Sequence, residues 1–186
     1  CEGGFRNITN SRQPVYGPSD VKGMKIRTME NPYHVAAFKS YGANPTPMAF
    51  SELYTALQQG TVDAQENPVS IIHAAKFYEV QKYCSLTGHV YGTVVMYVNK
   101  EFFDSLPEKY QDVIRKAAQD TKIRQREEAY RQDTGYIEEL KASGMEVNDL
   151  TSEEKAEFRK AAQPVYDEYV KKFGSELVDM ALKYNQ

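Results

Sequence analysis

The amino-acid sequence predicts an α/β protein built around a mostly parallel sheet. In the first half of the chain, short β-prone segments alternate with helical segments, and glycine or proline separates them. The second half instead carries a long, charged helical stretch over residues 108–142, which contains no proline. Because this helical half is too charged to form a core of its own, we expect it to pack across the sheet.

The first predicted elements are two strands separated by a loop. Residues 5–9 form a short β-prone segment, and residues 11–19 carry the glycine and prolines that are typical of a loop. Over residues 24–28, apolar side chains alternate with basic ones. This alternation predicts a strand that begins after the turn at Lys22 and Gly23.

Two helix starts are predicted where proline directly follows asparagine, after Asn31 and after Asn67. Asparagine caps the first turn through its side-chain oxygen, and proline fits the first helical position because its missing N–H would have no partner there. The first pair predicts a helix that runs to about residue 41 and ends at Gly42. The second predicts a helix to about residue 78.

Between these two pairs the sequence predicts one further helix and a short strand. Residues 43–50 hold two prolines and form an irregular or edge segment. Ser51 is expected to cap a helix that Gly60 ends, and a short strand follows over residues 62–65.

The remaining elements are predicted from local composition. Strands are expected over residues 80–86, 93–98 and 145–147, and helices over residues 108–142, 153–173 and 175–184. Residues 108–142 are interrupted only by Gly135 and their apolar side chains approximate a helical stripe, so they form one long helix or two abutting ones.

Length, charge and cysteine content exclude several classes of protein. The chain has 186 residues and a net charge of −3, without the basic surplus of a nucleic-acid binder. No apolar run reaches the roughly 18 residues that a membrane-crossing helix needs. With two cysteines, Cys1 and Cys84, there is neither a disulfide framework nor a cysteine-rich zinc site, and we expect Cys84 to be a small buried side chain.

No catalytic or metal-binding motif is visible in the sequence. There is no nucleophile elbow, no P-loop and no glycine-rich dinucleotide turn, so we expect neither an enzyme nor a cofactor. His34, His73 and His89 lack the spacing and the carboxylate neighbours of a zinc site. We interpret all three as structural or surface residues and predict no metal.

Arg27 is the strongest candidate for binding a ligand. It lies at the carboxyl end of a predicted strand, and ligands of open α/β sheets bind beyond such strand ends. Its planar guanidinium matches a carboxylate through two parallel hydrogen bonds. The alternative is a solvated arginine at a strand end.

Three further residues have both a binding and a structural interpretation. Asn67 either caps a helix or directs its amide into the same crevice as Arg27. Phe50 either packs in the core or forms a flat wall against the carbon chain of a ligand. Arg6, on the first strand, is either a surface arginine or a second cation for an anion. Glu66 is interpreted as a first-turn carboxylate that complements a helix dipole.

The chain resembles a known family in several separate blocks. They are DVKGMKIRTMENPYH, GANPTPMAFSELYTALQQGTVDAQENP, KFYEVQKYCSLTGHVY and NKEFFDSLPEKYQDVIRKAA. In this order and spacing they resemble the substrate-binding proteins of tripartite ATP-independent periplasmic (TRAP) transporters, the DctP family. The resemblance implies a periplasmic binding protein-like, type II-like fold, in which two α/β lobes are joined by hinge strands and a long helix crosses both lobes.

The resemblance also implies roles for individual residues. The carboxylate-clamping arginine of the family matches Arg27 in KIRT, its ligand-contacting asparagine matches Asn67 in QENP, and its pocket aromatic matches Phe50 in PMAF. A second arginine that many members place on a hinge strand matches Arg6 in GFRN. This last transfer is weaker, because the intervening loop needs a one-residue insertion relative to some members.

Family members are substantially longer at the N-terminus. We therefore expect this chain to be a C-terminal portion in which the first lobe is largely missing and the signal peptide is not included. The second lobe is expected over residues 1–92 and 145–186, and a remnant of the first lobe over residues 93–144. Apolar surface exposed on the remnant would favour oligomerisation or domain swapping.

The function implied by the resemblance is capture of a small organic acid in the periplasm. The receptor then delivers its ligand to a TRAP membrane permease driven by a sodium gradient and does no chemistry on it. Because Arg6 and Arg27 together can meet two polar ends, we expect a dicarboxylate or a sugar acid. The alternatives are a ligand-sensing or interaction domain of the same fold, an inactive fragment of such a receptor, or an enzyme with an acid–base pair near Arg27.

Overall fold

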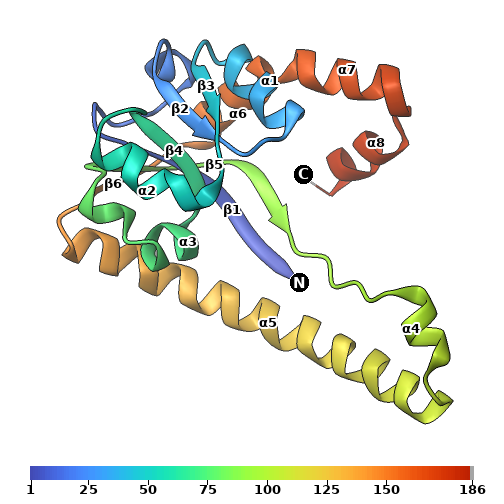
Figure 1. The fold of residues 1–186 in the computed structure, drawn as a ribbon. Coiled ribbons are helices and arrows are strands. Elements are labelled where there is room, and N and C mark those ends of the chain that lie inside the picture. The colour runs from blue at the N-terminus through green and yellow to red at the C-terminus, as the bar shows by residue number, and fades with distance from the viewer. Residues whose placement is uncertain (185–186) are drawn as a thin grey trace.

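The computed structural model describes residues 1–184 and has a six-stranded sheet with helices on both faces (Figure 1). In the order of the sheet, the strands are β3 (Asn44–Pro47), β2 (Lys25–Thr28), β4 (Ala64–Pro68), β1 (Glu2–Asn10), β5 (Tyr83–Thr93) and β6 (Glu146–Asp149). Strand β2 is parallel to β3 and β4, and β5 is parallel to β6, but β1 is antiparallel to both β4 and β5. The sheet is therefore mixed. The alternation of strands and helices did not indicate that β1 is antiparallel. It predicts parallel direction only for strands that a helix connects, and no α-helix precedes β1.

Eight α-helices and two short 3-10 helices connect the strands in the described part of the chain. The α-helices are α1 (Pro32–Ser40), α2 (Phe50–Gln58), α3 (Val69–Ala74), α4 (Lys100–Ser105), α5 (Glu108–Ala142), α6 (Ser152–Ala161), α7 (Gln163–Phe173) and α8 (Glu176–Lys183). The 3-10 helices are η1 (Pro18–Val21) and η2 (Phe77–Glu79). None of the helices described over residues 1–184 combines the length and the apolarity of a membrane span.

Two apolar cores lie on opposite faces of the sheet. The core beneath α1 and α6 centres on Ile26, Phe38 and Phe158, and the core beneath α2, α3 and the end of α5 centres on Leu53 and Leu140. All five side chains are almost completely buried. Burial of each such side chain contributes about 1.5–3 kcal/mol to the free energy of folding.

Several predicted elements are confirmed, and the reasons are local. Helix α1 begins after Asn31, whose side chain accepts hydrogen bonds from the N–H groups of Tyr33 and His34. The chain then turns at Gly42, where φ is +82°. Residues 108–142 form one helix of 35 residues rather than two abutting ones.

Other predicted elements are wrong. The helix predicted over residues 153–173 is broken at Ala162 into α6 and α7, because Pro164 has no N–H and fits only in the first turn of a new helix. Ser51 does not cap a helix, since α2 begins one residue earlier, at Phe50. The strand predicted over residues 93–98 is absent, because β5 ends at Thr93 and the chain is irregular from 94 to 99.

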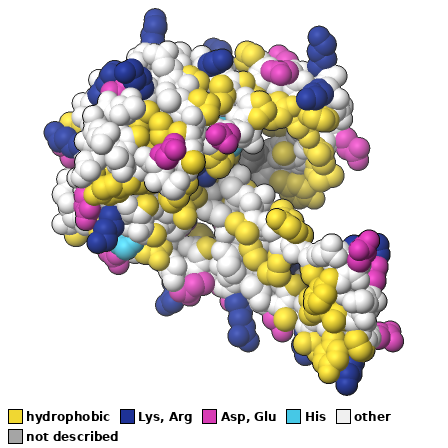
Figure 2. All heavy atoms as spheres, in the orientation of Figure 1, with side chains coloured by type: hydrophobic (Ala, Val, Ile, Leu, Met, Phe, Trp, Pro, Cys, Tyr) yellow, Lys and Arg dark blue, Asp and Glu magenta, His cyan; other side chains and the backbone are white. Residues whose placement is uncertain are grey.

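Only the second half of α5 packs against the rest of the molecule, from Gln125, which is hydrogen-bonded to Glu2, to Leu140, which is buried. We call residues 94–124 the arm, and residues 1–93 and 125–184 the body. The arm contains the irregular segment, α4 and the first half of α5, and it extends away from the sheet (Figure 1). Figure 2 shows hydrophobic side chains gathered on it, and within residues 94–124 no residue is buried. Val95 is 74% exposed and Tyr97 is 90% exposed.

Cys1 and Cys84 do not pair with each other. Cys84 is completely buried in the core beneath α2 and α3, in agreement with its predicted role as a small core residue. Burial raises the pKa of its thiol to about 12.

Candidate functional site

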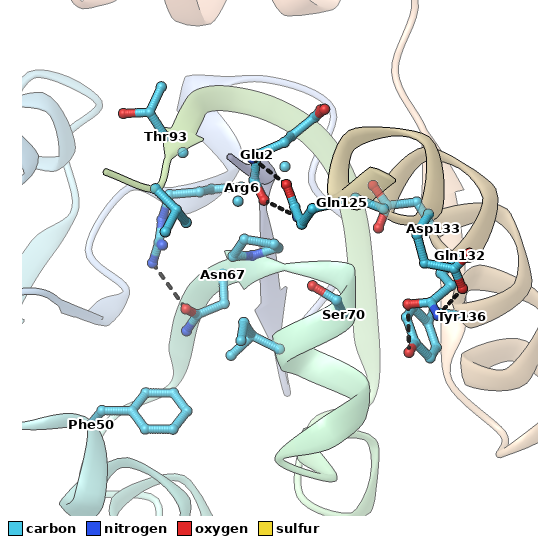
Figure 3. Close-up of a pocket in the computed structure, with 18 residues that line it drawn as sticks. Glu2, Arg6, Phe50, Asn67, Ser70, Thr93, Gln125, Gln132, Asp133 and Tyr136 are labelled. Carbon is cyan, nitrogen blue, oxygen red and sulfur yellow. Dashed lines mark hydrogen bonds between the residues drawn. The ribbon is translucent and has the colours of Figure 1, made fainter. Parts of the chain in front are cut away.

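The carboxyl ends of the inner strands β2 and β4 lie close to the start of α2 and to the middle of β1. The four candidate residues lie on these elements: Arg27 on β2, Asn67 on β4, Phe50 at the start of α2 and Arg6 on β1. Arg6, Phe50 and Asn67 line a pocket of about 650 Å³ between β1, α3 and α5 (Figure 3). The structure therefore brings three of the four candidates into one pocket and places the fourth beside it.

Arg27 is 3% exposed and does not line the pocket. Its Nε and Nη2 donate hydrogen bonds to the backbone carbonyl oxygen of Met48, at 3.1 and 2.9 Å. Its guanidinium lies 5.9 Å from the centroid of the Phe50 ring, which does line the pocket. The alternative of a solvated arginine is wrong, and the guanidinium lies one layer behind the pocket wall.

The charge of Arg27 has no acidic partner in ion-pair contact among residues 1–184. Burial lowers the pKa of Arg27, the field of Glu66 raises it, and the field of Arg6 lowers it. An arginine side chain nevertheless stays protonated in proteins. Within the described residues 1–184, Arg27 is therefore a buried cation whose side-chain hydrogen bonds go only to a neutral carbonyl group.

Arg6 is buried as well, but it is paired. Its Nε donates to Glu66 Oε2 at 2.5 Å, and its Nη2 donates to Glu66 Oε1 at 2.8 Å. Nη2 also donates to Asn67 Oδ1 at 3.1 Å. The surface alternative for Arg6 is wrong, because only 8% of the residue is exposed and its charge is neutralised inside the molecule.

Glu66 is the residue whose role the sequence analysis missed. It was interpreted as a first-turn carboxylate, but it lies in β4 and is completely buried. Besides Arg6, it faces His89 Nε2 at 3.3 Å and His34 Nδ1 at 3.8 Å. Burial by itself raises the pKa of this carboxyl, but His34, His89 and Arg6 outweigh burial and hold the pKa of Glu66 well below its usual range.

Asn67 is not a helix cap. It lies in β4, and α3 begins after Pro68 without any side-chain cap. Its Nδ2 donates to Gln65 Oε1, while its Oδ1 accepts from Arg6. An amide nitrogen carries two hydrogens, so one N–H of Asn67 is left for another acceptor in the pocket.

Phe50 combines the two roles that were considered for it. One edge of the ring packs against buried Phe77, with the ring centroids 6.0 Å apart in an edge-to-face arrangement. The residue is 49% exposed, and it forms one wall of the pocket (Figure 3).

Helix α5 supplies a pocket wall that the sequence analysis did not assign. Gln125, Gln132, Asp133 and Tyr136 lie along this wall, on the side opposite Asn67 and Phe50 (Figure 3). The Gln125 amide is fixed, because Nε2 donates to the carbonyl oxygen of Glu2 and Oε1 accepts from the N–H of Glu2, both at 2.7 Å. The apolar stripe of residues 108–142 does not include these four residues, so no sequence signal identified this face of the helix.

Comparison with known proteins identifies related sequences. A family model described as bacterial extracellular solute-binding protein, family 7 (DctP), matches residues 1–172. A solute-binding protein of Verminephrobacter eiseniae is 47% identical over 179 residues, which cover 96% of this chain and 53% of that protein. The 2,3-diketo-L-gulonate-binding periplasmic protein YiaO of Escherichia coli is 45% identical over 146 residues, which cover 78% of this chain and 44% of that protein. The chain thus spans about half the length of these relatives.

Solved structures match the fold and differ in their ligands. A TRAP periplasmic solute-binding protein from a Polaromonas species, bound to D-erythronate, is 46% identical with a TM-score of 0.88 and covers 94% of this chain and 57% of its own. Another from Shewanella oneidensis, with bound succinate, is 26% identical with a TM-score of 0.90 and covers 100% of this chain and 61% of its own. One of these ligands is a monocarboxylate and the other a dicarboxylate, so the comparisons do not select a ligand class.

Proposed function

The chain belongs to family 7 of the bacterial extracellular solute-binding proteins, the DctP-type receptors of TRAP transporters, and from this premise we propose that it binds a small organic acid in the periplasm for delivery to a membrane permease. This family consists of binding proteins, so the proposal includes no reaction on the ligand. The dicarboxylates and the sugar acids expected from the sequence are both within this class.

The observation that carries the proposal is the state of Arg27. It is a buried cation without an acidic partner within the described residues 1–184, and it lies behind the half-exposed ring of Phe50. A carboxylate is a stronger acceptor than the Met48 carbonyl group that Arg27 now contacts. A hydrogen bond to a charged group contributes about 1.5–3 kcal/mol. The ligand reaches the guanidinium when the Phe50 side chain or the Arg27 side chain moves.

The other candidate residues complete the proposed contact. Asn67 donates its remaining N–H to the ligand, and Phe50 packs against its carbon chain. Arg6 acts on Asn67, since its hydrogen bond to Oδ1 orients the amide. Because Glu66 neutralises Arg6, this second arginine orients the site and does not add a free positive charge to it.

The proposed function includes a division into two lobes, with residues 1–92 and 145–186 in one and residues 93–144 in the other. The exposed apolar side chains of the arm support this division, since the rest of a longer chain would cover them. In this division α5 connects the two lobes, because Leu140 near its C-terminal end is buried in the core beneath α2 and α3. Self-association of the isolated chain through the arm stays a prediction.

Titration calorimetry on the complete gene product tests the proposal. D-Erythronate, succinate and galactonate serve as probes, and Arg27→Ala is compared with Arg12→Ala. Arg12 is a surface arginine that pairs with Asp63 and lies outside the pocket. We expect Arg27→Ala to weaken carboxylate binding at least tenfold, since about 1.4 kcal/mol corresponds to a factor of ten. Unchanged affinity in Arg27→Ala, or no binding of any acid by the unmodified protein, contradicts the proposal.

A further inference from the structure

The two arginines at the pocket are not equivalent in charge. Arg6 is neutralised by Glu66 through two hydrogen bonds to the carboxylate, and both residues are buried. Arg27 contacts a neutral carbonyl group. One uncompensated positive charge therefore lies behind the Phe50 wall of the pocket, and this charge matches a single carboxylate.

The opposite wall of the pocket carries an uncompensated negative charge. Asp133 projects from α5 into the pocket and, within residues 1–184, makes no ion pair and no hydrogen bond. The neighbouring carboxylate of Glu128 is different, because it pairs with Arg131 at 2.8 Å. Burial raises the pKa of Asp133, and the field of Glu2 raises it further.

Space is left in front of the Asp133 carboxylate. Gly4 lines the same pocket, and a Cβ atom at this position would lie 3.6 Å from Asp133 Oδ2. Gly4 has a φ of +84°, a conformation that other residues rarely adopt. Gln132 and Tyr136, an amide and a phenol on α5, line the pocket beside Asp133 (Figure 3). This end of the pocket is thus polar and anionic, whereas the Phe50 wall has the cationic Arg27 behind it.

We infer that the pocket selects a monocarboxylic acid whose other end carries hydroxyl groups, such as a four- to six-carbon sugar acid, and discriminates against dicarboxylates through Asp133. The inference rests on the proposed function, because it assumes that the ligand carboxylate meets Arg27. Hydroxyl groups donate hydrogen bonds to the Asp133 carboxylate. A second carboxylate at the same place is repelled by it and finds no cation to compensate its charge.

Three four-carbon acids separate charge from size in a test on the complete gene product. D-Erythronate has one carboxylate and three hydroxyl groups, meso-tartrate has two of each, and succinate has two carboxylates and no hydroxyl group. We expect the unmodified protein to bind D-erythronate at least tenfold more tightly than either dicarboxylate. Equal or tighter binding of a dicarboxylate by the unmodified protein overturns the inference.

The Asp133→Asn variant tests the residue assigned to this selection. Asparagine keeps the size of the side chain and removes its charge, so we expect the ratio of D-erythronate to meso-tartrate affinity to fall at least fivefold. Glu138→Gln is the matched control on α5, because Glu138 is exposed, pairs with Lys141 and does not line the pocket. An unchanged ratio in Asp133→Asn overturns the role of Asp133.

The outcomes distinguish this inference from the proposed function. If acids bind and Arg27→Ala weakens their binding, but succinate is preferred, only the inference fails. If no acid binds, or if binding does not depend on Arg27, the proposed function fails and the inference fails with it. Thermal unfolding of each variant shows whether a lost preference reflects misfolding, and the preference of the unmodified protein tests the inference without any variant.

Discussion

The body and the arm of this molecule follow different rules of packing. The body surrounds a six-stranded sheet with two apolar cores, and its central side chains are almost completely buried. The arm has a similar supply of apolar residues, including Val95 and Tyr97, yet none of residues 94–124 is buried. The same composition therefore forms a core in one region and an uncovered surface in the other. The difference lies in the packing partners and not in the composition, because residues 1–184 supply nothing that buries the arm.

The largest expected effect separates the two regions by stability. Phe38→Ala in the body should lower the free energy of unfolding by about 3–5 kcal/mol, because it leaves a cavity in a closed core. Tyr97→Ala in the arm should change it by less than about 0.5 kcal/mol, because a side chain exposed to water loses no packing. Urea unfolding of the 186-residue chain, followed by circular dichroism, measures both. Equal losses would show that the arm is packed in solution. If a first lobe covers the arm, Tyr97→Ala should cost more in the complete gene product than in this chain.

A second effect of similar kind concerns the buried charges of the body. Glu66→Gln should lower the free energy of unfolding by about 3 kcal/mol, because the variant leaves the Arg6 charge buried without a partner. Glu128→Gln, which breaks a surface ion pair with Arg131, should cost less than about 1 kcal/mol. The same unfolding measurements compare the two variants. Similar costs for both would mean that water reaches the Arg6–Glu66 pair.

The pH dependence of stability should come from the body. The pKa of Glu66 in the folded state lies below its usual range, so the unfolded chain binds the proton more readily than the folded one. The stabilisation is therefore complete above about pH 5 and is lost as the pH falls through the unfolded pKa of about 4.3 towards the folded value. Urea unfolding between pH 3 and pH 7 should show this decline, and Glu66→Gln should show a shallower one. A variant with the same decline as the unmodified protein would assign the effect to other carboxyl groups.

The smallest expected effect lies at the boundary between body and arm. Gln125→Ala removes both hydrogen bonds to the backbone of Glu2 and should cost about 1–2 kcal/mol. Hydrogen exchange at the Glu2 amide should accelerate in the same variant. Gln119→Ala, on the exposed part of α5, is the control and should change neither quantity. If Gln125→Ala leaves the exchange of Glu2 unchanged, the amide of Gln125 does not join α5 to β1.

The sequence by itself determined the features that depend on neighbours within one helical turn. The start of α1 is encoded by Asn31 and Pro32, and its end by Gly42. The long helix over residues 108–142 follows from the absence of proline. The place of Arg27 near the carboxyl end of a strand was also predicted from a local pattern, whereas its role in binding stays a prediction.

The family resemblance, which covers essentially the whole chain, agrees with the family match over residues 1–172. The resemblance also named Asn67, although the local pattern around Asn67 resembled a helix cap. In the structure, Asn67 is instead a strand residue that is bonded to Arg6.

Only the tertiary structure decided how the site is charged. The pairing of Arg6 with Glu66 joins residues 60 positions apart, and it exists because β1 and β4 are neighbours in antiparallel register. Asp133 reaches the same pocket because α5 packs against α3 and β1, which no pattern in a charged helix predicts. Where a helix begins, ends or breaks depends on residues that are close in the sequence. The partner of a buried charge depends instead on strand register and on how helices pack, and these are properties of the whole fold.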